Sequence, residues 1–135
     1  MSDKILVIDD EVSVCDILKE TLNSEGYDVE TVTRGSQALD VLSRSSCAAL
    51  LVDIRIEGEV SGIDIIKHFR ERPSRPKILV ISATAKSFLE PVFKEEGISD
   101  LIDGILEKPR DMLAERLVAK LKQVLRAPEG ESKKS

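Results

Sequence analysis

Short apolar runs alternate with longer segments of helical period along most of the chain, and this pattern constrains the fold more than any other feature. Five runs of strand length lie at 4–8, 28–32, 48–54, 77–83 and 103–109. Strands that alternate with helices form βαβ units, which build a parallel sheet covered on both faces, with right-handed crossovers. The sequence therefore predicts an α/β fold, and 135 residues suit one domain with one core.

The segments between these runs have apolar residues at helical spacing. The first carries Val14, Cys15, Leu18 and Leu22 on one face, and the others lie at 35–45, 62–72, 86–97 and 110–125. Gly26 is expected to end the first helix in a left-handed conformation, and Pro73 to stop the third. Pro91 should kink or shorten the fourth helix unless it falls in the first turn. The last helix carries a stripe of leucines that we expect to pack into the core, with a dimer surface as the second interpretation: Leu113, Leu117, Leu121 and Leu125.

Composition excludes several classes of function. A net charge of −5 argues against a broad nucleic-acid footprint, and 3% aromatic residues argue against a stacking platform for single strands. No apolar run reaches the roughly 18 residues of a membrane helix, and the N-terminus is not a signal peptide. We therefore expect a cytoplasmic protein that binds neither nucleic acid nor membrane. Cys15 and Cys47 are expected to be free buried thiols rather than a disulfide, and with one histidine they make no zinc pattern.

Polar side chains stand where the predicted strands end. The first strand ends in Asp9 and Asp10, the third in Asp53, the fourth in Ser82 and the fifth in Lys108. In an open parallel sheet, ligands bind outside the carboxyl ends of the strands, so these groups should meet at one rim. Hard oxygen ligands without histidine or thiolate favour Mg²⁺, whose charge offsets the repulsion among the acids.

This set of groups suits phosphoryl transfer. A carboxylate acts as a nucleophile and forms an acyl phosphate. The phosphoryl oxygens require positive charge, which Mg²⁺ and Lys108 would supply, and the hydroxyl of Ser82 would donate to one of them. The sequence therefore predicts a cation-assisted phosphoacceptor site at this rim.

Four motifs in order resemble those of response-regulator receiver domains: "ILVIDDE", "LLVDIRI", "ILVISA" and "ILEKP". The resemblance covers about 3–126. It implies a doubly wound, flavodoxin-like (βα)5 fold with a five-stranded parallel sheet in the order 2-1-3-4-5. We expect a receiver domain over 1–126 and a disordered tail or linker stub over 127–135.

The resemblance assigns a role to each rim residue. Asp53 would be the phosphoacceptor, and Asp10, Asp53 and the backbone carbonyl of Arg55 would bind Mg²⁺, with Mn²⁺ as a substitute. Asp9 would reach the metal through water. Lys108 would pair with the acceptor and then with its phosphate, before a cis bond to Pro109, and Ser82 would be the switch hydroxyl.

A receiver domain implies partners rather than enzymatic turnover. The phosphoryl donor would be a histidine kinase or a histidine phosphotransfer protein of a two-component system or phosphorelay. Phosphorylation would alter the face formed by the fourth helix, fifth strand and fifth helix, in a monomer or in a phosphorylation-dependent dimer. The downstream target, or a fused effector domain, is not identified by the sequence.

The chain departs from the family pattern at several positions. Ile105 stands where an aromatic residue is usual, and its β-branched side chain is stiff. This substitution favours an alternative function, an interaction module whose binding is independent of phosphorylation. Glu57 replaces the usual proline, and with Glu59 it adds negative charge that we expect to slow anionic donors or to hold a second cation.

Several single residues have alternative interpretations. Asp9 and Asp10 have the chemistry of helix N-caps, as does Thr84, which alternatively tunes water access to the phosphate. His68 is expected to face solvent without a phosphohistidine role, and Arg55 to be an exposed gate. A phosphatase with an aspartate nucleophile is a third hypothesis, but the usual Asp-x-Asp after the first strand is lacking.

Overall fold

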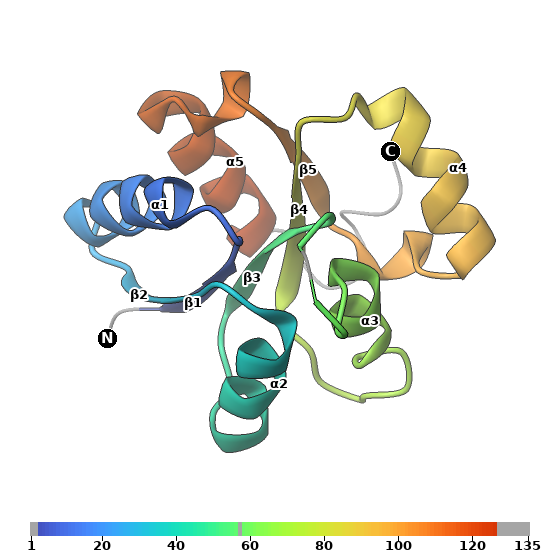
Figure 1. Ribbon diagram of the computed structural model, residues 1–135. Helices are drawn as coiled ribbons and strands as arrows, with labels where there is room; N and C mark the ends of the chain where they lie inside the picture. The colour runs from blue at the N-terminus through green and yellow to red at the C-terminus, as the bar shows by residue number, and fades with distance from the viewer. Residues whose placement is uncertain (1–2, 57, 127–135) are drawn as a thin grey trace.

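The computed structural model describes residues 3–56 and 58–126, which fold into alternating strands and helices (Figure 1). The strands are β1 (Lys4–Ile8), β2 (Asp28–Val32), β3 (Ala49–Asp53), β4 (Lys77–Ser82) and β5 (Gly104–Glu107). The α-helices are α1 (Val12–Ser24), α2 (Gly35–Arg44), α3 (Gly62–Lys67), α4 (Lys86–Glu96) and α5 (Ala114–Arg126). Two short 3-10 helices, η1 (Ser99–Leu101) and η2 (Arg110–Met112), flank β5. The tail expected over 127–135 lies outside the described residues.

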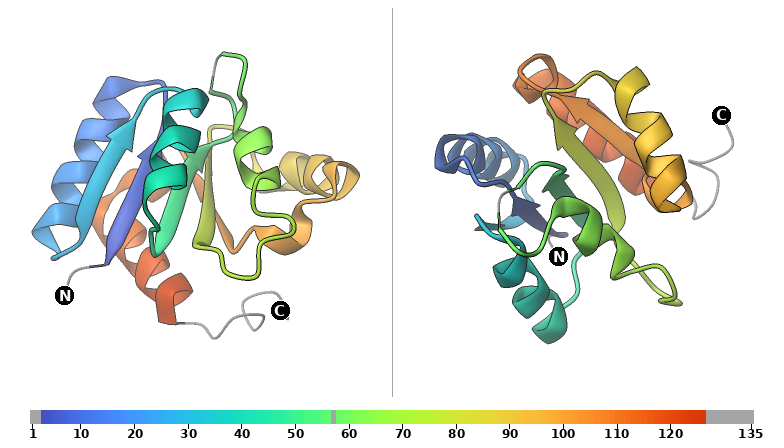
Figure 2. Two further views of the ribbon diagram at one scale, coloured as in Figure 1. Left: turned by 90° about the horizontal axis from the view of Figure 1, so that it is seen from below. Right: turned by 45° about the vertical axis from the view of Figure 1, so that its right-hand side comes forward.

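All strand pairs are parallel, and the sheet has the predicted order β2-β1-β3-β4-β5. The chain moves outward from β1 to β2, returns past β1 to β3, and then adds β4 and β5. The point where the order reverses lies between β1 and β3, where Ile8 pairs with Val52. Both strands therefore deliver their next residues to the same edge of the sheet, as Figure 2 shows for the strand arrows.

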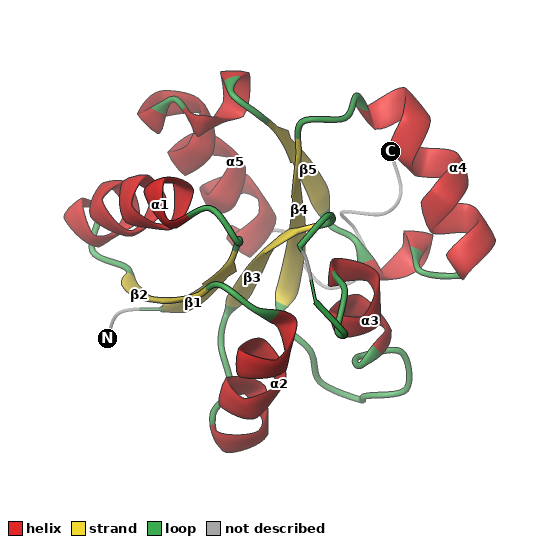
Figure 3. Cartoon of the chain, in the orientation of Figure 1, coloured by secondary structure: helices red, strands yellow, loops and turns green. Residues whose placement is uncertain are grey.

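Helices cover both faces of the sheet and divide the core into two layers (Figure 3). Side chains of α1 and α5 pack on one face, with Leu18 and Leu117 fully buried. Side chains of α2, α3 and α4 pack on the other, where Ile65 and Phe93 are buried. Since every residue of a central strand points into one layer or the other, strands without polar alternation are stable here. The predicted doubly wound fold is confirmed.

Two helices are shorter than the sequence predicts. α3 ends at Lys67, and the chain continues in tight turns in which the amides of Phe69 and Arg70 bond to carbonyls three residues back. α5 begins only at Ala114, because the preceding residues form η2. Leu113 is consequently 62% exposed and does not join the buried stripe.

The details of helix ends also differ from expectation. α4 continues through Pro91 to Glu96, and the proline is exposed, so the expected shortening does not occur. Gly26 has the expected positive φ, 95°, directly after α1. The N-cap of α1 is Glu11 and that of α4 is Ala85, which removes the N-cap readings of Asp9, Asp10 and Thr84.

The N-terminus of α2 is packed tightly against the β3–α3 loop. Gly35 is buried, and a Cβ atom there would lie 2.2 Å from the carbonyl oxygen of Val60. We expect Gly35→Ala to lower the free energy of unfolding by about 2 kcal/mol, because the backbone must shift to relieve the overlap. Urea unfolding would measure it. Ser36→Ala, at the exposed neighbouring position, is the control, and equal stability of the two variants would contradict this packing argument.

Within the described part of the chain, every helix is too short or too polar to cross a lipid bilayer.

Candidate functional site

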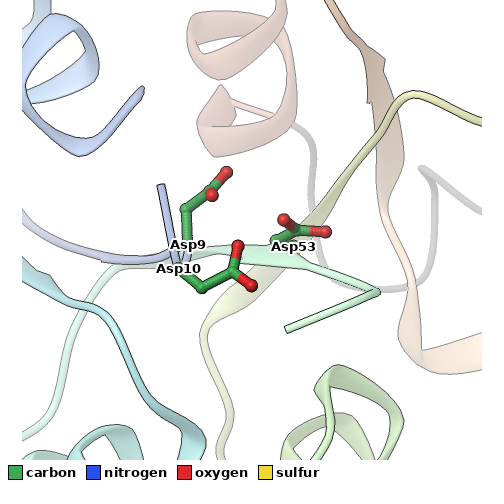
Figure 4. A group of neighbouring side chains, drawn as sticks. All are labelled: Asp9, Asp10 and Asp53. Atoms are coloured by element: carbon green, nitrogen blue, oxygen red, sulfur yellow. The ribbon is translucent and has the colours of Figure 1, made fainter. Parts of the chain in front are cut away.

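Three aspartates meet at the switch point of the sheet. Asp9 and Asp10 follow β1, and Asp53 is the last residue of the neighbouring β3. Carboxylate oxygens of all three lie within 4.8 Å of one another. Figure 4 shows the side chains at the adjoining strand ends, with Asp10 directed toward Asp53. Asp9 and Asp53 are buried, whereas Asp10 is exposed, so the site opens to solvent on the Asp10 side.

Lys108 brings a positive charge to this group from the end of β5. Its Nζ lies 2.8 Å from Asp9 Oδ2 and 3.3 Å from Asp53 Oδ2. The backbone amide of Lys108 donates to the carbonyl of Ser82, at the end of β4, over 2.8 Å. The peptide between Lys108 and Pro109 is cis, as predicted. Lys108 therefore pairs with Asp9 and Asp53, and Asp10 lies beside these two aspartates.

Backbone amides fix the two buried carboxylates. Asp9 Oδ1 accepts from the amide of Glu11, and Asp53 Oδ1 accepts from the amide of Arg55, both over 2.9 Å. Each aspartate thus bonds to the amide two residues ahead, a local turn that aspartate readily forms. The second oxygen of each carboxylate remains directed toward Lys108.

Burial and the pairing of opposite charges have opposing effects on the pKa values of Asp9 and Lys108. Burial raises the pKa of Asp9, and the charge of Asp53 raises it further, against the lowering effects of Lys108 and the Glu11 amide. Burial tends to lower the pKa of Lys108, but its bond to Asp9 and the charges of Asp53 and Asp9 outweigh this, so the pKa is raised. Lys108 is consequently a permanent cation held among carboxylates.

The donor set fits a divalent cation with a preference for oxygen. Asp9 Oδ2 is buried, and it has no aligned hydrogen-bond donor in the described chain although Lys108 Nζ is close. Lys108 supplies one positive charge to several carboxylates, so a bound cation would offset the negative charge that remains. Asp9, Asp10 and Asp53 provide the oxygen ligands that Mg²⁺ prefers. The backbone carbonyl of Arg55 as a further ligand stays a prediction, although the Arg55 amide is in place on Asp53.

Ser82 lies beside the charged group without contacting it through its side chain. It is buried at the end of β4, one residue beyond Ile81, the partner of Asp53 in the sheet. Its hydroxyl accepts from the amide of Thr84 over 2.9 Å, and in the described residues it bonds to no group of the acidic site. Because the hydroxyl oxygen accepts from Thr84, its own proton remains available as a donor, and the switch role of Ser82 stays a prediction.

The sequence analysis did not assign Glu11 to the site, yet Glu11 Oε1 lies 3.2 Å from Lys108 Nζ. It is the third acid of the "DDE" run, so the signal was visible. What the sequence does not reveal is that the chain turns at Glu11, the N-cap of α1, and directs this side chain back to the lysine.

The remaining candidates add no charged group to the site or lie outside the described residues, although Cys15 Sγ donates to the backbone carbonyl of Asp9 over 3.2 Å. Cys15 is buried and Cys47 half-buried, and both are free thiols; burial raises the pKa of Cys47 to about 11. His68 is half-buried, with its ring Nε2 3.0 Å from an Arg72 nitrogen. Ile105 packs partly against the core layer of α2, α3 and α4. Glu57 lies outside the described residues.

Comparison with known proteins identifies the class to which this fold and site belong. The family described as "response regulator receiver domain" matches residues 5–122. The chain is therefore a member of the response regulator receiver domain family, the signalling domains of two-component systems.

Two relatives are about 30% identical to this chain over the residues that align. The phosphate regulon transcriptional regulatory protein PhoB of Rhizobium meliloti is 31% identical over 126 residues, which are 93% of this chain and 53% of PhoB. The sporulation initiation phosphotransferase F of Bacillus subtilis is 30% identical over 97 residues, which are 72% of this chain and 77% of the relative. The chain spans about half the length of PhoB and of the similarly matched RegX3 proteins.

Solved structures show the same fold. Chemotaxis protein CheY4 of Vibrio cholerae has a TM-score of 0.79 at 25% identity, covering 92% of this chain and 99% of CheY4. The response regulator TrrA of Thermotoga maritima, solved in complex with Mg²⁺-BeF, has a TM-score of 0.74 at 27% identity, with 92% and 99% coverage.

Proposed function

We propose that this domain accepts a phosphoryl group from a phosphohistidine onto Asp53 in a Mg²⁺-dependent step. The observation that carries the proposal is the contact between Lys108 Nζ and Asp53 Oδ2, 3.3 Å, beside two further aspartates at the switch point. Asp53 is 6% exposed and the neighbouring Asp10 is exposed, so a donor would approach from the Asp10 side.

The transfer makes one bond and breaks one bond. A carboxylate oxygen of Asp53 forms the new O–P bond while the N–P bond of the donor imidazole breaks, and the bonding pair returns to the imidazole nitrogen, which then takes a proton. Lys108 remains against the phosphoryl oxygens and neutralises charge there. Later, water attacks phosphorus, inorganic phosphate leaves, and the Asp53 carboxylate is regenerated.

Asp10, Asp53 and the carbonyl of Arg55 would hold the cation, and Asp9 would reach it through water. When bound, Mg²⁺ supplies positive charge to the transferring phosphoryl group and offsets the repulsion among the acids. Mn²⁺ is expected to substitute because it accepts the same oxygen ligands.

Signalling would proceed from Ser82 to the face formed by α4, β5 and α5. The hydroxyl of Ser82 would leave the amide of Thr84 and donate to a phosphoryl oxygen, and the loop before α4 would follow. The backbone bond from Lys108 to Ser82 supports this route, because it ties the site to the ends of both β4 and β5. The partners would be a histidine kinase or a histidine phosphotransfer protein in the cytoplasm, and then a downstream protein target or fused effector.

Treatment with acetyl phosphate tests this function. We expect intact-mass measurement to show one phosphoryl adduct in the presence of Mg²⁺ and none after chelation, with Mn²⁺ restoring the adduct. Absence of an adduct under all three conditions, in a protein that is folded by circular dichroism, would refute the proposal.

Ile105 favours a second function, an interaction module whose binding is independent of phosphorylation. Its side chain is partly packed against the core layer that includes Phe93 of α4, so the domain has no aromatic ring at this position to reorient. A protein partner that binds wild type and Asp53→Asn with equal affinity, with and without acetyl phosphate, would favour this alternative over a phosphorylation switch.

A further inference from the structure

The ammonium group of Lys108 is shared by three carboxylates that differ in burial. Asp9 and Asp53 have side chains that are 0% and 9% exposed. The third, Glu11, lies 3.2 Å from Nζ with a side chain that is 60% exposed. The two aspartates are fixed by backbone amides, but in the described chain the Glu11 carboxylate has only the lysine as a partner.

The backbone of Glu11 is fixed beside the site by hydrogen bonds, whereas its carboxylate bonds to no backbone group of α1. Its amide donates to Asp9 Oδ1, and its carbonyl accepts from the amides of Val14 and Cys15 at the start of α1. Its side chain caps no amide of α1. The Glu11 carboxylate therefore lies on the solvent side of Lys108, where an exposed ion pair is easily exchanged for another.

We propose that Glu11 is a specificity-determining residue that occupies Lys108 before phosphorylation and thereby slows small anionic phosphodonors. The inference rests on the proposed function. A phosphoryl group on its way to Asp53 needs Lys108, and it must either displace Glu11 or react beside an additional negative charge. Glu11 thus discriminates against dianionic small donors relative to donors of lower charge.

Rates of phosphoryl incorporation test the contact, with acetyl phosphate as the dianionic donor and phosphoramidate as a donor of lower charge. We expect Glu11→Gln to accelerate labelling by acetyl phosphate about fivefold, as removal of one nearby unit charge implies. Labelling by phosphoramidate should gain less. The gain should shrink as ionic strength rises, because the Glu11 carboxylate is exposed to screening.

Two further variants separate the Lys108 contact from charge in general. Glu11→Asp keeps the charge but is one methylene shorter, and we expect it to react faster than wild type because it no longer reaches Lys108. Glu20→Gln makes the same charge change about 13 Å further along α1 and should react like wild type. Unfolding midpoints and Mg²⁺ titrations of each variant exclude effects through stability or cation affinity.

The outcomes are distinct. If wild type accepts phosphoryl groups and Glu11→Gln is no faster, the role of Glu11 is overturned and the proposed function stands. The role of Glu11 is also overturned if Glu20→Gln accelerates labelling by acetyl phosphate as much as Glu11→Gln does. The same holds if Glu11→Asp is labelled at the wild-type rate. If wild type accepts no phosphoryl group, the proposed function itself fails.

Discussion

Asp53→Asn is expected to abolish phosphoryl incorporation while the domain stays folded. The amide has the shape of the carboxylate, so Oδ1 still accepts from the amide of Arg55. It lacks the nucleophilic charge, so no acyl phosphate forms. Intact mass after acetyl phosphate and Mg²⁺ measures the loss. In chelator the variant should unfold at a urea concentration close to that of wild type, because the lost pair with Lys108 is offset by the relieved repulsion between Asp53 and Asp9.

The chemistry of any remaining adduct makes the test specific. An acyl phosphate is hydrolysed in alkali, whereas a phosphoryl group on the imidazole of His68 is stable there. Asp40→Asn, an exposed aspartate in α2, is the control and should label like wild type. An alkali-labile adduct in Asp53→Asn at wild-type stoichiometry would assign the acceptor to another carboxylate.

Lys108→Met should destabilise the protein strongly in the absence of divalent cations. The substitution keeps the methylene stem but removes the ammonium group, and in the described residues no other basic side chain pairs with Asp9 or Asp53. Loss of one partner leaves buried charges uncompensated, so we expect the free energy of unfolding in chelator to fall by about 3 kcal/mol. Added Mg²⁺ should restore part of this loss, since the proposed cation occupies the same group of acids. Urea unfolding in chelator and in Mg²⁺ measures both effects.

A surface lysine provides the comparison for this prediction. Lys122 pairs with Glu25 at 3.4 Å, and the two side chains are 42% and 40% exposed, against 14% for Lys108. Exposed pairs contribute little, so Lys122→Met should unfold close to wild type under both conditions. If Lys108→Met were as stable as wild type in chelator, Lys108 would not be the group that compensates the buried carboxylates.

Much of the fold could be predicted because the central strands are apolar on both faces. A run such as "KILVI" is stable only between two layers of helices, and this requirement leads directly to a parallel sheet. The same logic placed Asp9, Asp10 and Asp53 together, since parallel strands end at one edge. The closeness of these residues was thus implied by topology before any side chain was placed.

The sequence-based predictions were wrong where a local turn overrides the helical spacing of apolar residues. Leu113 matches the helical stripe of α5, but the amide of Glu107 bonds to Asp111 Oδ2 over 2.8 Å and the chain turns there. Helical spacing alone cannot anticipate this turn, which delays the helix and leaves Leu113 exposed. Glu11 was missed for a related reason, because its direction depends on the backbone angles at the N-cap of α1.

The separation of the apolar interior into two layers has a consequence for how this sequence can vary. The β1–β3–β4 strands stand between α1 and α5 on one side and α2, α3 and α4 on the other. A volume change in one layer has to be accommodated by neighbours in that layer, because the intervening backbone transmits little of it. Compensating substitutions are therefore expected to pair residues on the same side, and either half of the interior can be redesigned while the other is kept.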